Sequence, residues 1–343
     1  MANLMTWLTI NRICNLRCKW CYQKEVAGSV KTMDFQLSKE LIDLCSNLFV
    51  NSIILIGGEP TLHPNFFEIV KYIKNKGITT SIVSNSIKFA DNKFVENAKL
   101  CGVKAVNTSI KGSSKEEYLK STGCDVFHLV KKAIRNLENS EIDQLISVTI
   151  SNSIITNWIQ MINFINELGV KNFIFSFEKP TILLNDLTFD DRMLPGNIAE
   201  FIQDVMYPSL KQTGVNFKIE LMFPQCVLRD SFVEKLENEY HAFGGCLLLR
   251  CDRRIVFDPD GFVLPCNHFI ANPLGKYGDD FQNAQEFLDW KQSEGVRNFY
   301  QMTKMAPGER CARCDKWSKC GAGCRLYWLY KESDKLLPKS VQC

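Results

Sequence analysis

The sequence predicts an α/β protein in which a parallel sheet curls into a full or partial barrel, followed by a cysteine-rich region. Three observations support this prediction. Short β-rich runs alternate with helical stripes over about the first 215 residues, polar segments follow the strands, and most cysteines fall in two separate groups. Strands that alternate with helices form repeated βαβ units, and right-handed crossovers curl such a sheet toward a barrel.

Six runs are expected to be strands, at residues 4–10, 52–56, 78–84, 103–110, 145–150 and 172–177. The helices between them are expected from apolar stripes at residues 37–48, 66–73 and 157–168, and Gly77 and Gly169 follow two of these stripes as helix ends. Residues 179–197 have turn chemistry, and a helix is expected over residues 198–210. No further βαβ unit is expected after residue 215, which predicts a barrel domain at 1–215, and a linker strand followed by a second, cysteine-rich domain at 216–343.

The composition is that of an ordinary globular protein. Of the 343 residues, 45% are hydrophobic and 23% are charged, which excludes a disordered or fibrous chain. The 41 Lys and Arg residues and 38 Asp and Glu residues give a net charge of +3, so nucleic acid and an anionic membrane are not expected partners. No apolar run reaches the roughly 18 residues of a membrane helix, and no secretory signal begins the chain. We therefore expect a cytoplasmic protein.

The 15 cysteines are the unusual feature of the chain. A disulfide scaffold would be a shorter, secreted protein, whereas cysteines in a reducing cytoplasm more often bind metals or act in catalysis. Three cysteines fall within eight residues near the start, and eight fall in the last hundred residues. The remaining four are interpreted as small buried hydrophobic residues, and these are Cys45, Cys101, Cys124 and Cys226.

The first group has the spacing C-x3-C-x2-C, formed by Cys14, Cys18 and Cys21. Three thiolates on a short loop can hold three irons of a cubane cluster and leave the fourth iron open for another ligand. A zinc site or a chance cluster of cysteines is the alternative interpretation. A Gly-Gly-Glu-Pro segment at residues 57–60 follows the second expected strand. With these two motifs, the sequence resembles the radical S-adenosylmethionine (SAM) superfamily over about residues 5–215.

The resemblance implies a partial (β/α)6 barrel and a [4Fe-4S] cluster whose open iron binds the amino and carboxylate groups of SAM. One-electron cleavage of SAM would then give a 5′-deoxyadenosyl radical that abstracts a hydrogen atom from the substrate. The implied SAM-binding residues are the ammonium-binding motif Gly57, Gly58, Glu59 and Pro60, the adenine neighbour Trp20, Ser84 and Asn85 after the third strand, and the ribose neighbour Ser109. A purely structural role is the alternative for the last four. Lys111 departs from the family pattern, because related maturases often carry an acid there.

The second group of cysteines comprises Cys246, Cys251, Cys266, Cys311, Cys314, Cys320, Cys324 and Cys343. Cysteine pairs with C-x2-C spacing also bind zinc, so two structural zinc sites are the alternative. The complete spacing resembles the SPASM extension of radical SAM maturases, a small cysteine-rich α+β domain. This resemblance implies two auxiliary [4Fe-4S] clusters, one on Cys246, Cys251, Cys266 and Cys324 and the other on Cys311, Cys314, Cys320 and Cys343. Three clusters are therefore expected in all.

The substrate class has two interpretations. SPASM proteins mostly modify ribosomally made peptides, so the resemblance favours a peptide or protein substrate that is oxidised, crosslinked or otherwise modified. The alternative is a dehydrogenase or epimerase of a small molecule such as a sugar, an amino acid or a cofactor precursor. The GTP cyclase of molybdenum-cofactor synthesis is not expected, because the chain lacks its Gly-Gly C-terminus and has more C-terminal cysteines.

Residues near Cys266 bear on the chemistry. In the sulfatase-maturing members an Asp follows the equivalent cysteine and acts as a base, whereas Asn267 and His268 follow it here. Formylglycine-type oxidation is therefore not expected. His268 is a candidate base, and a hydrogen-bonded structural histidine is the alternative.

Partner proteins are the last expectation from the sequence. The first strand is expected within ten residues of Met1, so a peptide substrate would need a separate leader-peptide-binding protein or direct binding. Flavodoxin or ferredoxin is the expected electron donor.

Overall fold

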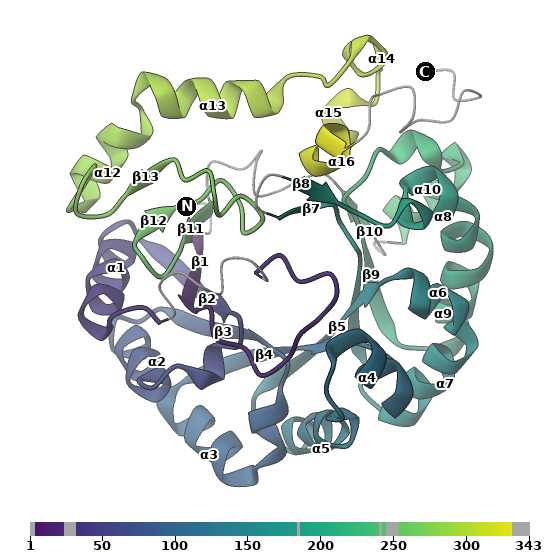
Figure 1. Ribbon diagram of the computed structural model, residues 1–343, viewed down its shortest axis with the longest axis horizontal. Coiled ribbons are helices and arrows are strands. Elements are labelled where there is room, and N and C mark those ends of the chain that lie inside the picture. The colour runs from purple at the N-terminus through teal and green to yellow at the C-terminus, as the bar shows by residue number, and fades with distance from the viewer. Residues whose placement is uncertain (1–3, 24–31, 184–185, 240–241, 245–253, 331–343) are drawn as a thin grey trace.

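An 11-stranded sheet forms the centre of the protein in a computed structural model, which describes residues 4–23, 32–183, 186–239, 242–244 and 254–330. The strand order is β10-β9-β6-β5-β4-β3-β2-β1-β11-β12-β13. Neighbours from β10 to β11 are parallel, and the β11–β12 and β12–β13 pairs are antiparallel. Figure 1 shows the strands curving around an interior without closing into a complete ring. The sheet is therefore a partial barrel.

The strands of this sheet are β1 (Leu4–Asn11), β2 (Val50–Gly57), β3 (Thr79–Ser84), β4 (Val103–Ile110), β5 (Asp143–Ile150), β6 (Asn172–Phe177), β9 (Asn216–Leu221), β10 (Ala242–Gly244), β11 (Arg254–Phe257), β12 (Phe262–Val263) and β13 (Gly275–Lys276). A separate antiparallel hairpin consists of β7 (Thr181–Leu183) and β8 (Asp186–Thr188).

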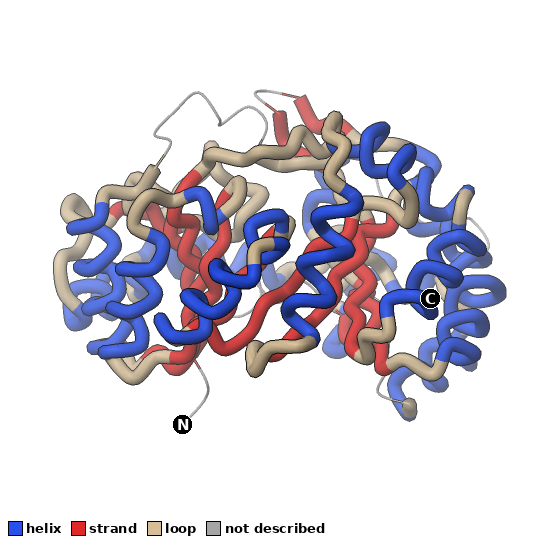
Figure 2. The backbone as a smooth tube through the Cα atoms, turned by 90° about the horizontal axis from the view of Figure 1, so that it is seen from below, coloured by secondary structure: helices blue, strands red, loops and turns tan. Residues whose placement is uncertain are grey.

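Helices form an outer layer around the strands, as Figure 2 shows from below. They are α1 (Phe35–Asn47), α2 (Phe66–Asn75), α3 (Asn92–Cys101), α4 (Lys115–Thr122), α5 (Phe127–Glu138), α6 (Asn152–Thr156), α7 (Trp158–Leu168), α8 (Pro195–Glu200), α9 (Tyr207–Thr213), α10 (Asp230–Asn238), α12 (Ala284–Lys291), α13 (Glu294–Lys304), α14 (Glu309–Ala312), α15 (Trp317–Cys320) and α16 (Arg325–Tyr330). Single helical turns are η2 (Pro60–Leu62), η3 (Ile87–Ala90), η4 (Asp191–Met193) and η6 (Gln225–Val227), and η5 (Phe201–Met206) is a wider turn between α8 and α9.

The strands carry buried apolar residues on one face and partly exposed, small polar residues on the other, as β5 illustrates. In β5, Ile146, Val148 and Ile150 are fully buried in the core shared with the outer helices, whereas the residues between them are partly exposed. The period of two in a strand separates these two faces. The helix side is therefore the hydrophobic core, and the interior side of the β5–β6 wall carries hydroxyl side chains such as Ser147, Thr149 and Ser176.

The six predicted strands are confirmed as β1 to β6, and the predicted helical stripes are confirmed as α1, α2 and α7. The expectation that no βαβ unit follows residue 215 is wrong, because β9 pairs in parallel with β6 after the helices α8 and α9. The segment Asn216–Leu221 alternates polar and apolar residues, which is typical of a half-exposed strand rather than of a buried parallel one. The predicted domain boundary at 215 stays a prediction.

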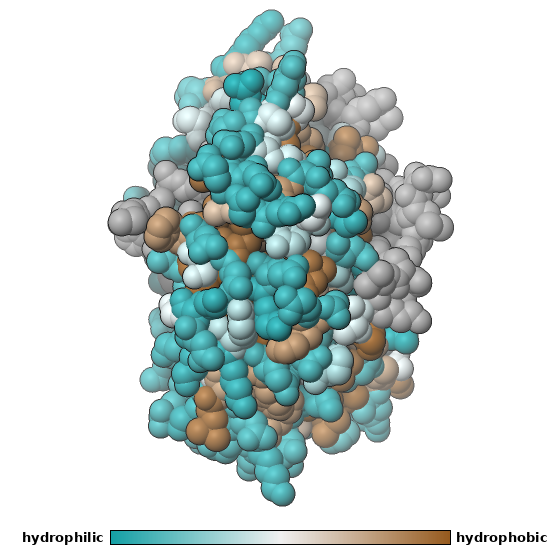
Figure 3. All heavy atoms as spheres, turned by 90° about the vertical axis from the view of Figure 1, so that its left-hand side faces the viewer, coloured by the Kyte–Doolittle hydropathy of each residue, from teal (hydrophilic) through white to brown (hydrophobic). Residues whose placement is uncertain are grey.

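The hydrophilic surface and the short or polar helices agree with the composition of an ordinary globular protein. The face in Figure 3 is mostly hydrophilic, with hydrophobic residues scattered over it. Within the part of the chain that the structure describes, every helix is too short or too polar to cross a membrane.

Candidate active site

The cysteine loop, residues 12–23, follows β1 and lies across the middle of the curved sheet (Figure 1). The backbone N–H of Gly58 donates to Asn11 O at 3.0 Å, and that of Glu59 donates to Ile13 O at 2.7 Å. A Cβ atom on Gly57 would lie 2.3 Å from Asn11 O, and one on Gly58 would lie 2.5 Å from Ile13 O. Only glycine permits this close approach of two backbones. The two glycines of the motif therefore dock the start of the cysteine loop.

A second contact holds the other half of the loop. The backbone N–H of Arg17 donates to Thr122 O at 2.8 Å, and that of Lys19 donates to Ser121 O at 3.0 Å. Both acceptors lie in the last turn of α4, whose carbonyl groups have no partners within the helix. The loop is thus fixed between the Gly-Gly-Glu-Pro segment and α4.

The three loop cysteines are partly buried. The pKa of Cys14 is raised to about 12, mainly by burial and also by the negative charges of Glu59, Cys18 and Cys21, although the hydrogen bond from the Leu16 N–H lowers it. In the described residues, no three His, Cys, Asp or Glu side chains are gathered closely enough to hold a single metal ion. A cubane cluster instead uses one cysteine per iron. The thiolates would need the positive charge of such a cluster to form here, and their role as its ligands stays a prediction.

The carboxylate of Glu59 is buried and accepts four hydrogen bonds. Its Oε1 atom accepts from the Thr61 N–H at 3.2 Å, the Thr61 hydroxyl at 2.7 Å and the Ser84 hydroxyl at 2.8 Å. Its Oε2 atom accepts from the Asn85 N–H at 2.7 Å. The pKa of Glu59 is raised overall, because the effect of burial exceeds the opposing effect of these donors. Pro60 follows Glu59 as the buried first residue of η2. Because Glu59 follows β2 and binds Ser84 and Asn85 at the end of β3, the motif joins the ends of these two strands.

The Asn85 side chain continues this network to the cysteine loop. Its Nδ2 atom donates to Asn15 Oδ1 at 2.7 Å, and its Oδ1 atom accepts from the Ile87 N–H at 3.1 Å. Asn11, at the end of β1, is fully buried and donates to Glu59 O, but its Oδ1 atom has no partner within the protein. A buried acceptor without a partner beside the motif fits a ligand that donates hydrogen bonds, such as an ammonium group.

Trp20, Ser109 and Lys111 form a group at the end of β4. The Lys111 ammonium lies 2.5 Å from Ser109 Oγ and 6.0 Å from the centre of the Trp20 ring. The backbone N–H of Lys111 is held by the Tyr118 hydroxyl at 3.1 Å. The structure therefore brings together the two residues predicted beside the adenosine of SAM, and places the unusual lysine between them.

A buried ion pair connects the cysteine loop to the region after β11. The Arg12 guanidinium lies 2.6 Å from Asp258 Oδ2 and 2.9 Å from Asp260 Oδ2. The side chains of Arg12 and Asp258 are only 3% and 4% exposed. The pKa of Asp258 is raised overall, because the effect of burial exceeds the opposing effect of the positive charge of Arg12. The turn Asp258–Gly261, which the sequence predicts from its composition, is thus fixed against the start of the cysteine loop.

Five of the eight C-terminal cysteines are described, and Cys246, Cys251 and Cys343 lie outside the described residues. Cys320 Sγ accepts from the Gln225 N–H at 3.3 Å, and the Cys324 N–H donates to Met222 O at 2.6 Å. Gly323 between them leaves no room for a side chain, because a Cβ atom would lie 2.4 Å from the Phe223 backbone. This segment therefore packs on the end of β9.

The ends of β6 and β9 carry an ion pair, 3.4 Å long, between Lys179 and Glu220. His268 lies nearby, and its ring centre is 4.7 Å from that of Tyr22 in the cysteine loop. Burial, and secondarily the charge of Lys179, lowers the pKa of His268 to about 3. The imidazole is thus neutral, and its low pKa makes it a weak proton acceptor. The role of His268 as a base stays a prediction.

With this geometry, the cysteine loop and the Gly-Gly-Glu-Pro segment on a partial barrel define a class of enzyme that binds SAM and an iron–sulfur cluster. Residues 8–168 match the Radical SAM superfamily. The chain therefore contains a radical SAM domain, which confirms the resemblance that the motifs of the barrel region carry. The domain implies a [4Fe-4S] cluster and SAM as cofactors.

Proteins related in sequence are named for a reaction of a small molecule, GTP. The chain is 28% identical over 289 residues to a "Probable GTP 3′,8-cyclase" of Saccharolobus islandicus strain M.14.25, a match that covers 80% of this chain and 88% of that protein. A protein of the same name from strain Y.N.15.51 is 33% identical over 134 residues, or 38% of this chain. The chain spans only 42% of the length of that second relative.

Solved structures show the same fold at low sequence identity. The anSMEcpe structure with bound AdoMet and Kp18Cys peptide has a TM-score of 0.75 and 17% identity, and the match covers 98% of this chain and 92% of that one. Streptococcus suis SuiB bound to its precursor peptide SuiA has a TM-score of 0.69 and 16% identity, with 99% and 75% covered. The fold therefore extends over the C-terminal region as well as the barrel.

Sequence reasoning missed the ion pairs of Arg12 and of Lys179. Both connect residues far apart in the chain, and no local pattern indicates such partners. The position of Lys179 in the loop two residues after a predicted strand is the available clue, because loops after parallel strands open on one face of a barrel.

Proposed function

We propose that this radical SAM enzyme modifies a peptide or protein substrate, by oxidation, crosslinking or another change at a carbon centre. The observation that carries the proposal is the charge balance near the ends of β5 and β6. Lys179 is paired with Glu220, and Arg192 is paired with Asp190 at 2.8 Å. Two cations in this region are thus neutralised by carboxylates of the protein, and a neutral peptide backbone matches such a surface.

The fold supports this proposal. SuiB and anSMEcpe, whose fold extends over nearly the whole of this chain, have structures with a precursor peptide and with the Kp18Cys peptide. A bound cluster and SAM would supply the one-electron chemistry that removes a hydrogen atom from the substrate. The residues of this chain would hold SAM between the glycine motif and the Trp20–Ser109 group, and would keep the substrate on the side of Lys179 and His268.

A small-molecule reaction is the second candidate, and the name of the relatives favours it. A nucleoside triphosphate carries several negative charges and requires a surplus of Lys and Arg side chains to bind it. Lys111 is one such side chain, but it lies beside Ser109 on the SAM side of the site. The pairing of Lys179 and Arg192 with carboxylates therefore argues against a triphosphate on the other side.

We also propose that the C-terminal cysteines bind two auxiliary [4Fe-4S] clusters in the partition that the SPASM resemblance implies. The packing of the Cys320–Cys324 segment on β9 and the burial of Cys266 and Cys324 support this assignment, since both place cysteines beside the barrel. Flavodoxin or ferredoxin would donate the electron, and a separate leader-peptide-binding protein would present a peptide substrate.

The decisive experiment measures 5′-deoxyadenosine. The protein is reconstituted anaerobically, its iron and sulfide are quantified, and SAM and dithionite are added with either GTP or a lysate of the source organism. We expect stimulation by the lysate, loss of that stimulation after protease digestion, and none by GTP. The Cys14→Ala variant is the control, because it lacks one cysteine of the cluster-binding motif and should form no 5′-deoxyadenosine. Stimulation by GTP alone would reject the peptide proposal.

A further inference from the structure

Three buried polar atoms near the ends of β5, β6 and β9 have no hydrogen-bond partner within the protein. They are Ser151 Oγ, Asn267 Oδ1 and His268 Nδ1. Ser151 is 5% exposed and Asn267 is 8% exposed. Buried polar groups are nearly always hydrogen-bonded in folded proteins, so each exception requires an explanation. A bound ligand that supplies the missing partners is one such explanation.

Ser151 is the clearest exception. It is the N-cap residue of α6, a position at which serine normally accepts a hydrogen bond from the second or third residue of the helix, but its side chain forms no such bond. Its backbone is extended, with φ −120° and ψ 168°, so the alternation of β5 continues through it. Because Ile146, Val148 and Ile150 face the helices, Ser151 falls on the interior side. Its hydroxyl is therefore available to a ligand inside the barrel.

The neighbours of Ser151 place it beside the Lys179–Glu220 pair. The backbone N–H of Glu178 donates to Ile150 O at 2.9 Å, which joins the end of β6 to the residue before Ser151. Lys179 follows directly and reaches Glu220 on β9, and its charge also acts on His268. The ends of three strands and the segment after Cys266 thus contribute polar groups to one region.

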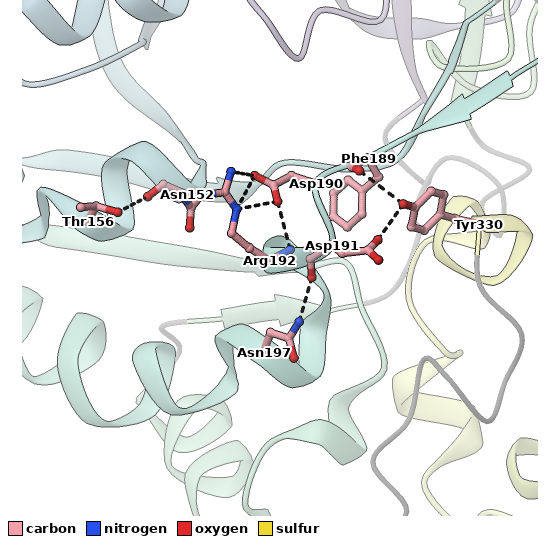
Figure 4. A network of polar contacts seen from close by, with 8 residues as sticks. All are labelled: Asn152, Thr156, Phe189, Asp190, Asp191, Arg192, Asn197 and Tyr330. Carbon is pink, nitrogen blue, oxygen red and sulfur yellow. Dashed lines mark hydrogen bonds and ion pairs between the residues drawn. The ribbon is translucent and has the colours of Figure 1, made fainter.

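A hydrogen-bonded segment, residues 190–192, borders this region. The Tyr330 hydroxyl donates to Asp191 Oδ1 at 2.6 Å, and Asn197 Nδ2 donates to Asp191 O at 2.8 Å (Figure 4). Figure 4 also shows the Arg192 guanidinium turned to the carboxylate of Asp190. The charge of Glu178 acts on Arg192, so this segment lies near the end of β6. Its hydrogen bonds run to Tyr330 in α16 and to Asn197 in α8, and none of them uses Ser151.

We propose that Ser151 Oγ anchors an amide group of the substrate, in a subsite bordered by the Lys179–Glu220 pair and His268. The assignment rests on the proposed peptide substrate and makes it more specific. A hydroxyl both donates and accepts, as does a peptide amide, and Asn267 Oδ1 can accept a second amide N–H. The neighbouring ion pair has no net charge, which matches a neutral amide better than a phosphate.

The test compares two serine variants at opposite ends of β5. Ser151→Ala removes a hydroxyl without a partner, whereas Ser140→Ala removes one that donates to Leu137 O at 2.7 Å and accepts from the Ile142 N–H at 3.2 Å. The probe is a pool of N-acetylated, C-amidated neutral tripeptides. For each cluster-loaded protein we measure the thermal midpoint alone, its rise with increasing pool concentration, and the dissociation constant of SAM.

The expected result separates binding from folding. Ser151→Ala keeps the thermal midpoint and the SAM dissociation constant of the wild type, but needs about 3- to 10-fold more of the pool for the same rise, as expected for the loss of one hydrogen bond. Ser140→Ala lowers the midpoint and keeps the response to the pool. A lower midpoint for Ser151→Ala, weaker SAM binding, or an unchanged response to the pool would overturn the subsite.

The same measurements separate the subsite from the proposed function. If the pool fails to raise the midpoint of the wild type while the protease-sensitive lysate still stimulates 5′-deoxyadenosine formation, the subsite is wrong and the peptide proposal stands. If GTP raises the midpoint and stimulates the reaction while the lysate does not, the peptide proposal itself fails.

Discussion

The two sides of the barrel interior differ in how their polar groups are satisfied. On the first side, at the ends of β1 to β4, Glu59 accepts four hydrogen bonds and Arg12 forms two ion pairs, and these contacts bind the cysteine loop to the sheet. On the second side, at the ends of β5, β6 and β9, Ser151 and His268 keep buried polar atoms without partners. Asn11 Oδ1 also lacks a partner on the first side, but the carboxylate of Glu59 and the guanidinium of Arg12 are paired by the protein itself, whereas Ser151 and His268 offer their unpaired atoms to the proposed ligand.

This difference predicts opposite effects of substitution. Removing a polar group from the first side should destabilise the fold, because its partners remain buried and unpaired. Removing one from the second side should change ligand binding or pH dependence and leave the stability near neutral pH unchanged. Thermal unfolding of the cluster-loaded protein under anaerobic conditions can compare the two sides directly.

Arg12→Met should have the largest effect on stability. It leaves the Asp258 carboxylate, only 4% exposed, without its cation. Breaking a buried pair in this way costs about 3–5 kcal/mol. The matched control is Lys179→Met on the second side, where the pair is longer and each partner is about one-fifth exposed, so the cost should stay below about 1 kcal/mol. Equal shifts of the thermal midpoint would remove the distinction between the two sides.

Glu59→Gln should have a smaller but clear effect. A glutamine can keep its oxygen toward Thr61 and Ser84, but its amide group then faces the Asn85 N–H, which loses its acceptor. A buried donor without an acceptor costs about 1–3 kcal/mol. The thermal midpoint should therefore fall, and Glu220→Gln should change it less, because Glu220 is partly exposed. A Glu59→Gln protein as stable as the wild type would show that the network does not hold the motif.

The sequence predicts much of the first side and little of the second. Strand and helix periodicity locates β1 to β6, and the cysteine and glycine motifs are local patterns that mark the predicted SAM side. Lys179, Glu220 and Ser151 belong to no motif. Their role depends on the parallel pairing of β9 with β6 and on a serine that fails to cap its helix.

These features are properties of the folded chain. The ion pair of Arg12 with Asp258 spans 246 residues, so no sequence window contains both partners. The sequence of β9 alternates polar and apolar residues, a pattern that does not indicate a strand within a parallel sheet. Substrate-side residues on a barrel are drawn from several separate loops, and only their assembly in space distinguishes them from surface polar residues.

His268→Phe should have the smallest effect, and it concerns pH. The pKa of His268 lies near 3 in the folded protein, whereas a free histidine has a pKa of about 6.5. The unfolded chain therefore binds a proton below pH 6.5 that the folded protein does not, and the free energy of unfolding falls as the pH decreases from 6.5 toward 3. Between pH 7.5 and 5.5 this one group should account for about 1 kcal/mol of that loss.

Phenylalanine preserves an aromatic ring at the contact with Tyr22 and removes the unpartnered Nδ1 atom. The variant should match the wild type in thermal midpoint at pH 7.5 and exceed it at pH 5.5, as measured with both proteins carrying their clusters. Glu59, whose pKa is raised by burial, changes stability in the opposite direction with pH and is present in both proteins, so its contribution cancels in the comparison. Parallel pH curves for the two proteins would mean that His268 is solvated, and the second side would then lose one of its buried polar groups.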